Sequence, residues 1–152
     1  MIALLQRVTE ASVRVDGAVV GSIGPGLLVL AGVRRDDDES CAERLIQRVL
    51  GYRVFADAGG RMNLSLAQTG GGLLLVPQFT LAADTRNGTR AGFSTAAAPD
   101  AALRLFQYLL GRARSLHSPV AAGAFGAHMQ VALVNDGPVT FWLESGGQGG
   151  LE

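Results

Sequence analysis

Two short segments carry polar groups within apolar, strand-like stretches. The first, Pro77-Gln78-Phe79-Thr80-Leu81, follows a run of leucine and valine. Proline removes a hydrogen-bond donor from a strand, so this position marks an edge strand, a bulge or a functional site. The Thr80 hydroxyl could act as a nucleophile, but the segment holds no base to activate it. Backbone N–H groups around Phe79 and Thr80 could instead stabilise an oxyanion.

The second segment runs from Asn135 to Thr140 and places Gly137-Pro138 between two apolar runs. A Gly-Pro step in this position is typical of a tight turn or of a cis peptide bond. An ordinary hairpin turn is the simpler interpretation, and the residues alone leave both open.

Other residues that commonly carry catalysis are isolated. Neither His117 nor His128 has a Cys or Asp near it in sequence, which favours surface or structural roles. Cys41 is the only cysteine, so it can form no internal disulfide and no multi-cysteine metal site, and a small buried residue is expected there. The acids from Asp36 to Glu39 are interpreted as the start of a helix, where carboxylates complement the helix dipole. We expect no metal and no other cofactor.

Composition narrows the class of protein further. The chain has 152 residues, of which 48% are hydrophobic and 17% charged, which suits one domain with a single core. Thirteen basic residues, all arginine, balance thirteen acidic ones. The absence of lysine excludes a Walker A loop and a Schiff-base lysine. Zero net charge disfavours non-specific binding of duplex nucleic acid, so we expect no DNA partner. Short apolar runs and the lack of a signal-like start predict a cytoplasmic protein that does not contact membranes.

The elements that would position the two segments form an α+β pattern. A helix is expected after the acids at 36–39, and a second one from Pro99. Strands are expected at 2–9, 12–15, 18–23, 27–33, 73–81, 129–135 and 139–143. This order predicts a single domain at 1–145 with a curled, barrel-like, mostly antiparallel or mixed sheet and two main helices. A flexible Gly-rich tail is expected at 146–152.

At these two segments the sequence resembles the D-aminoacyl-tRNA deacylases. Gln78-Phe79-Thr80-Leu81 matches the family pattern Ser-Gln-Phe-Thr-Leu, and residues 135–140 match Asn-x-Gly-Pro-x-Thr. The resemblance covers residues 1 to 145, and further family-like stretches are Gln6-Arg7-Val8, Met62-Asn63-Leu64, Ala82-Ala83-Asp84-Thr85 and Met129-Gln130-Val131. The departures are Pro77 in place of the family serine and Arg90-Ala91-Gly92-Phe93 in place of Arg-Pro-Ser-Phe.

The resemblance implies a homodimer that hydrolyses the ester between a D-amino acid and the terminal ribose of tRNA, gripping only the acceptor end. Gly137-Pro138 would be a cis step that one subunit presents to its partner's pocket, where it excludes L side chains but does not reject glycine. Arg7 would brace that loop, since a guanidinium offers several fixed donors. Met129 would contact the substrate. The catalytic residues would be Gln78, Phe79 and Thr80.

Alternative functions remain open at this point. Pro77 followed by Gln resembles an animal deacylase group of relaxed chirality that clears certain L-aminoacyl-tRNAs, whereas Phe79 and the Gly137-Pro138 pair favour the D-specific type. A non-catalytic module that binds the end of tRNA is a second alternative, and a small-ligand-binding or amidohydrolase-like oligomer is a third. Five arginines between residues 86 and 114 predict a small basic patch for the RNA end: Arg86, Arg90, Arg104, Arg112 and Arg114.

Overall fold

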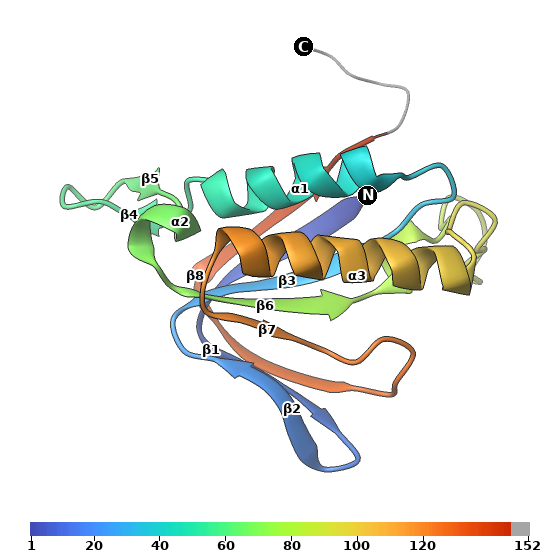
Figure 1. Ribbon diagram of the computed structural model, residues 1–152, viewed down its shortest axis with the longest axis horizontal. Helices are drawn as coiled ribbons and strands as arrows, with labels where there is room; N and C mark the ends of the chain where they lie inside the picture. The colour runs from blue at the N-terminus through green and yellow to red at the C-terminus, as the bar shows by residue number, and fades with distance from the viewer. Residues whose placement is uncertain (147–152) are drawn as a thin grey trace.

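Two long helices cover one face of a curled six-stranded sheet (Figure 1). The computed structural model describes residues 1–146, so the predicted tail lies outside the described residues except for Gly146. The sheet contains β1 (Ile2–Val15), β2 (Ala18–Ile23), β3 (Gly26–Gly32), β6 (Gly72–Pro77), β7 (Val120–Ala122) and β8 (Gln130–Glu144). The other elements are α1 (Glu39–Gly51), the hairpin β4 (Phe55–Ala56) and β5 (Met62–Leu64), the single-turn α2 (Leu66–Thr69), the 3-10 turn η1 (Phe79–Ala82) and α3 (Pro99–Leu116).

The sheet is mixed, as predicted, and β1 organises it. The strand order is β2-β1-β3-β6-β7, and β8 pairs with β1. The pairs that include β1 are antiparallel, whereas β3–β6 and β6–β7 are parallel. The first half of β1 pairs with β3 and its second half pairs with β2, while β8 follows it along most of its length. One long strand shared among three partners curls the sheet toward a barrel.

The N-terminal strand prediction was wrong in one respect, because 2–9 and 12–15 form one continuous strand. The register with β8 shifts between Val8 and Glu10, so Thr9 is accommodated as an irregularity that bends β1 without ending it. The predicted turn at Asp16-Gly17 is confirmed, with positive φ angles of 49° and 80°. Three strands therefore stand where four β segments were expected.

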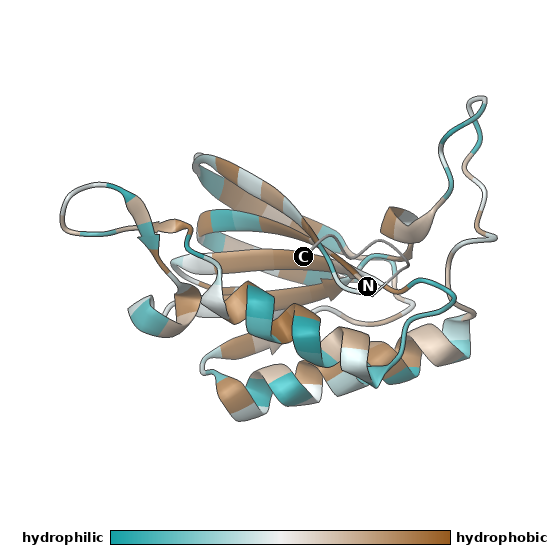
Figure 2. Ribbon diagram, turned by 90° about the horizontal axis from the view of Figure 1, so that it is seen from above, coloured by the Kyte–Doolittle hydropathy of each residue, from teal (hydrophilic) through white to brown (hydrophobic). Residues whose placement is uncertain are grey.

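The helices bury their apolar faces against the sheet, and their polar residues face outward (Figure 2). Asp38 caps α1 by accepting a hydrogen bond from Cys41 N at 3.0 Å, which confirms the interpretation of the acidic run. Cys41 is buried, as expected. Arg112 of α3 reaches Glu43 of α1 at 2.7 Å, and this hydrogen bond holds the pKa of Glu43 below its usual value.

The second half of the chain departs from the predicted strand pattern at two places. The strand expected through Leu81 ends at Pro77, which offers no N–H to continue the ladder, and the chain turns into η1. The strands expected on either side of Gly137-Pro138 form one element, β8, with an irregularity in its middle. Within residues 1–146, no helix is long and apolar enough to cross a membrane.

Candidate active site

The first sequence motif forms a sharp turn at the end of β6. Gln78 N donates to Ala31 O at 2.8 Å and keeps the chain beside β3, after which η1 begins. Phe79 and Thr80 open this 3-10 turn, so their N–H groups have no acceptor within it. Neither N–H donates a hydrogen bond within residues 1–146. Two adjacent unpartnered amides are therefore available to an oxygen of a bound molecule.

Phe79 and Thr80 are exposed and Gln78 is half-buried, and their side chains are ordered by local contacts. Gln78 Nε2 donates to Thr80 Oγ1, which orients the hydroxyl. Phe79 is 60% exposed, and its ring centroid lies 5.2 Å from that of Phe93 in the following loop. Among residues 1–146, Thr80 Oγ1 has no hydrogen bond to an acid or a histidine. In the described part of the chain, therefore, no base is hydrogen-bonded to the Thr80 hydroxyl.

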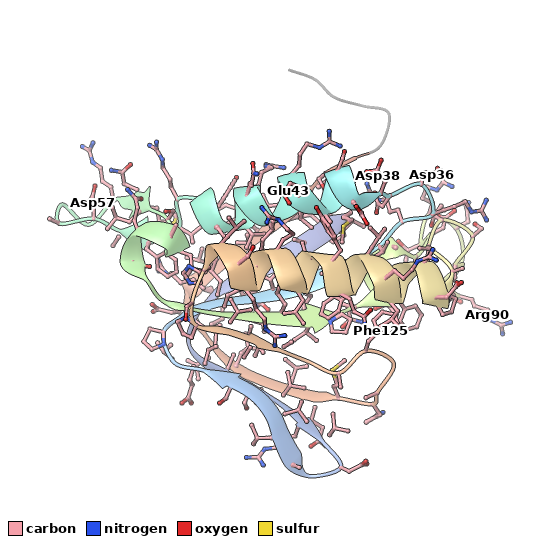
Figure 3. The ribbon with its side chains drawn as sticks, viewed as in Figure 1. Asp36, Asp38, Glu43, Asp57, Arg90 and Phe125 are labelled. Atoms are coloured by element: carbon pink, nitrogen blue, oxygen red, sulfur yellow. The ribbon has the colours of Figure 1, made fainter. Side chains whose placement is uncertain are left out.

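A pocket of about 450 Å³ opens on one side of this turn. It lies between the end of β6, the start of α3 and the loop that leads into β8, near Phe125 in Figure 3. Its walls are largely apolar and include the predicted site residues Gln78, Phe79 and Met129. The remaining lining residues are Val76, Pro77, Ala97, Pro99, Ala102, Phe125, Gly126, Ala127, His128 and Val131. Such a pocket can hold a flat or apolar group beside the free amides.

Met129 is held in the pocket wall by its own loop. Ala124 N donates to Met129 Sδ at 3.3 Å, and a Cβ at Gly123 would approach that sulfur to 2.8 Å. Phe125 packs 6.3 Å, centroid to centroid, from Phe106 of α3. The wall is therefore preformed.

A wider groove of about 720 Å³ lies on the other side of η1 and includes Thr80, Trp142 and Glu144. Trp142 Nε1 donates to Glu144 Oε1 at 2.7 Å, which lowers the pKa of that carboxylate. At the rim, Arg86 pairs with Asp84 and holds the pKa of Asp84 at about 2. Within residues 1–146, no three His, Cys, Asp or Glu side chains are grouped so that they could hold a metal ion.

The second motif forms a closed loop in the middle of β8. Gln6 of β1 stands opposite Thr140 and Val8 opposite Asn135, so four residues of β8 face a single residue of β1. Asn135 closes the base of the loop, because its Oδ1 accepts from Val139 N at 3.1 Å and its Nδ2 donates to Thr140 Oγ1 at 2.9 Å. These bonds account for Asn and Thr at the two ends of the motif.

Gly137 and Pro138 occupy the exposed tip of this loop. The peptide bond between them is cis, and Gly137 has a φ of +136°. A Cβ at Gly137 would lie 2.7 Å from Val139 Cγ2 and 3.1 Å from Arg7 Nη2. The tip therefore requires glycine for both its backbone conformation and its space.

Arg7 links this loop to the start of the β4–β5 hairpin. Its Nε donates to Asp136 O at 3.0 Å, and its Nη1 donates to Val54 O at 2.7 Å. The guanidinium thus contacts the loop next to Gly137, at the place where the sequence prediction put a brace. Its part in substrate selection stays a prediction.

The two motifs do not meet within one chain. Trp142 and Thr80 line the same groove, whereas Pro138 lies four residues before Trp142, at the tip of the loop in β8. Neither Gly137 nor Pro138 lines the groove or the pocket, so within residues 1–146 the loop tip is not part of either cavity beside η1.

Several site residues were not foreseen from the sequence. Ala102, Phe125 and His128 line the pocket, yet they come from a helix start and an irregular loop with no periodic pattern. His117, expected to be structural, places Nε2 2.6 Å from Gly71 O. The predicted arginine patch was wrong in part, because Arg86 is paired with Asp84 and Arg112 with Glu43.

An apolar pocket beside two free backbone amides is a feature of hydrolases that stabilise an oxyanion with main-chain donors. The model of one protein family, described as D-Tyr-tRNA(Tyr) deacylase, matches residues 4–144. The chain therefore belongs to the D-Tyr-tRNA(Tyr) deacylase family, as the two motifs predicted.

Curated relatives and solved structures agree with this assignment. The D-aminoacyl-tRNA deacylase of Thioalkalivibrio sulfidiphilus is 68% identical over 144 residues, covering 95% of this chain and 97% of the relative. That of Alkalilimnicola ehrlichii is 65% identical over 145 residues, with the same coverage of 95% and 97%. A solved c-Myc DNA Unwinding Element Binding Protein superposes with a TM-score of 0.92 at 37% identity, covering 97% of this chain and all of that one. A probable eukaryotic D-amino acid tRNA deacylase shares the fold, with a TM-score of 0.81 at 17% identity, covering 94% and 98%.

Proposed function

We propose that this protein hydrolyses the ester bond of D-aminoacyl-tRNA in the pocket beside η1. The observation that carries the proposal is the pair of unpartnered N–H groups at the start of η1, where Phe79 lines the apolar pocket and Thr80 lines the groove on the other side of the turn. Family membership supports the substrate class.

The proposed chemistry is the attack of water on an activated ester. Water adds to the ester carbonyl, and the amides of Phe79 and Thr80 donate to the oxyanion that forms. The carbon–oxygen bond to the ribose then breaks, and the ribose oxygen takes a proton. The products are the free amino acid and tRNA with a free hydroxyl. The neighbouring ribose hydroxyl assists the water, and the reaction consumes no cofactor.

Thr80 acts as a positioning residue in this proposal. Its hydroxyl accepts from Gln78 Nε2 and has no base beside it within the described residues, which argues against a nucleophile. We expect both Thr80→Ala and Thr80→Val to lower kcat by less than about tenfold, or 1.4 kcal/mol. Single-turnover rates with D-tyrosyl-tRNA measure the effect. A loss beyond a thousandfold in both variants would assign the nucleophile to Thr80.

We further propose that the enzyme is a homodimer in which each copy places its Gly137-Pro138 tip at the pocket of the other. The exposed tip supports this arrangement, and among the described residues neither Gly137 nor Pro138 lines the groove or the pocket of its own chain. The carbonyls at the tip would accept from the substrate α-ammonium group. An L side chain would then run into the loop, whereas a D side chain would point away from it, and glycine would be accepted.

A comparison of esters tests the proposed activity. D-Tyrosyl-tRNA should be hydrolysed, whereas the ethyl ester of D-tyrosine should not, because the pocket and its surroundings are proposed to bind the tRNA end. Hydrolysis of neither ester would remove the deacylase proposal. Equal hydrolysis of both would favour a small-ester hydrolase unrelated to tRNA.

A further inference from the structure

The β4–β5 hairpin projects from the domain and carries a motif that the proposed chemistry does not use. Met62-Asn63-Leu64 forms β5, and Met62 is 50% exposed. The hairpin extends beyond the end of α1, with Asp57 in its outer loop (Figure 3). The pocket opens beside the first residues of α3. The hairpin lies at the opposite end of the domain (Figure 1).

The outer loop of the hairpin is rigidly built. Asp57 Oδ1 accepts from Gly59 N at 2.9 Å and from Arg61 N at 3.0 Å. Asp57 N also donates to Arg61 O at 2.8 Å, and Gly60 has the positive φ of 79° that this turn needs. Such a loop would lose little conformational freedom when it binds a partner.

Four exposed arginines occupy the hairpin and the neighbouring part of α1. We call them the arginine surface: Arg44, Arg48, Arg53 and Arg61. Within residues 1–146, none of them forms an ion pair with a carboxylate. Asp57 is the only acidic residue between positions 44 and 63, which gives this segment a formal charge of +3 in a chain of net charge zero. Arg48 Nη1 donates to Glu144 O at 2.8 Å and Arg53 Nη1 to Asn63 Oδ1 at 3.3 Å, and these neutral acceptors leave both positive charges in place. Guanidinium groups without a carboxylate partner can form a local anion-binding surface.

Arg7 connects this surface to the Gly-Pro tip. One guanidinium donates both to Asp136 O, next to Gly137, and to Val54 O. Val54 N in turn donates to Leu64 O at 3.1 Å, at the base of the hairpin. Arg7 therefore ties the loop tip to the base of the hairpin. If a tip enters the partner's pocket, we expect the hairpin of the same copy to approach the tRNA that occupies that pocket.

We infer that the arginine surface binds the phosphate backbone of the tRNA whose aminoacylated end occupies the partner's pocket. This inference rests on the proposed function and on the exchange of tips. Each contact between an arginine and a phosphate releases a counterion. Loss of one such contact should therefore make the plot of log affinity against log salt concentration less steep by about 0.9. The two hairpin arginines, Arg53 and Arg61, are the test positions. Their removal tests the hairpin without altering residues that line the pocket.

The test compares Arg53→Gln/Arg61→Gln with wild type on two substrates, D-tyrosyl-tRNA and D-tyrosyl-adenosine. For the tRNA, kcat/KM should fall between 50 and 200 mM KCl in both proteins, and the factor by which it falls should be about ten times larger for wild type than for the variant. The variant should show a raised KM and an unchanged kcat. D-Tyrosyl-adenosine carries no acceptor stem, so the two proteins should hydrolyse it alike. The adenosine ester also verifies that the variant is folded.

The matched control is Arg14→Gln, an exposed arginine near the β1–β2 turn whose Nη1 contacts Gly17 O at 3.3 Å. Its salt slope should equal that of wild type. The inference is overturned if the hairpin variant keeps the wild-type slope and KM, or if Arg14→Gln changes the slope by half as much as the double variant. If wild type hydrolysed neither D-tyrosyl-tRNA nor D-tyrosyl-adenosine, the proposed function would be overturned instead.

Discussion

Gly137→Ala should lower kcat/KM for D-tyrosyl-tRNA about a hundredfold, while the protein stays folded. The new Cβ would meet Val139 Cγ2 at 2.7 Å and Arg7 Nη2 at 3.1 Å, and the φ of +136° disfavours any L residue. The loop must therefore shift, and a displacement of about 1 Å at a substrate-binding group can cost a hundredfold in rate. Rates with D- and L-tyrosyl-tRNA, measured in parallel, should also show weaker discrimination.

The matched control for this variant is Gly17→Ala. Gly17 also has a positive φ, of 80°, but a Cβ there would meet nothing within 4 Å. Both variants carry a backbone penalty of about 1 kcal/mol, and both positions are exposed. Gly17→Ala should keep the wild-type rate and selectivity. Wild-type rate and selectivity in Gly137→Ala would show that the tip takes no part in the reaction.

Gly26→Ala should be the most destabilising of these substitutions, costing about 3 kcal/mol or more in the free energy of unfolding. A Cβ at Gly26 would lie 1.9 Å from Gly72 O, the carbonyl of its partner residue at the start of the parallel β3–β6 pair. Gly72 in turn faces Ile23, whose Cβ would be 2.8 Å from a Cβ at position 72. Three strands meet here, so neither backbone can retreat.

Urea unfolding of Gly26→Ala and Gly24→Ala provides the comparison. Gly24 lies two residues earlier, and a Cβ there would meet nothing within 4 Å. The midpoint should fall sharply for Gly26→Ala and change little for Gly24→Ala, with the slope unchanged in both. Equal midpoints would mean that the close approach of the two strands is not required for the fold.

Periodicity predicted the elements that bury an apolar face. The helix after Asp38 and the one from Pro99 both form, and Asp16-Gly17 makes the predicted turn. The errors concern strand boundaries, at places where the alternation of apolar and polar residues does not show clearly whether a strand ends. Thr9 lies in an irregularity that the paired strand β8 accommodates, so β1 continues past it. Pro77 ends its strand, although apolar residues continue to Leu81.

The candidate site was predictable only in its motifs. Local sequence singled out Thr80 and Gly137, but not that within residues 1–146 the loop tip lines neither cavity beside η1. Phe125 lies in the pocket wall because it packs against Phe106 of α3, and no pattern in the neighbouring sequence indicates this contact.

Charge counting along the sequence was equally limited. Arg112 seemed free between residues 86 and 114, yet Glu43 neutralises it from a different helix. The unpaired arginines of the hairpin and α1 became visible only once the ion pairs were known.

The most direct test of the account is parallel hydrolysis of D-tyrosyl-, L-tyrosyl- and glycyl-tRNA by the purified protein. We expect the D ester and the glycyl ester to be hydrolysed while the L ester persists, because under the proposed function only an L side chain would collide with the Gly137-Pro138 tip. Rapid hydrolysis of L-tyrosyl-tRNA would contradict it.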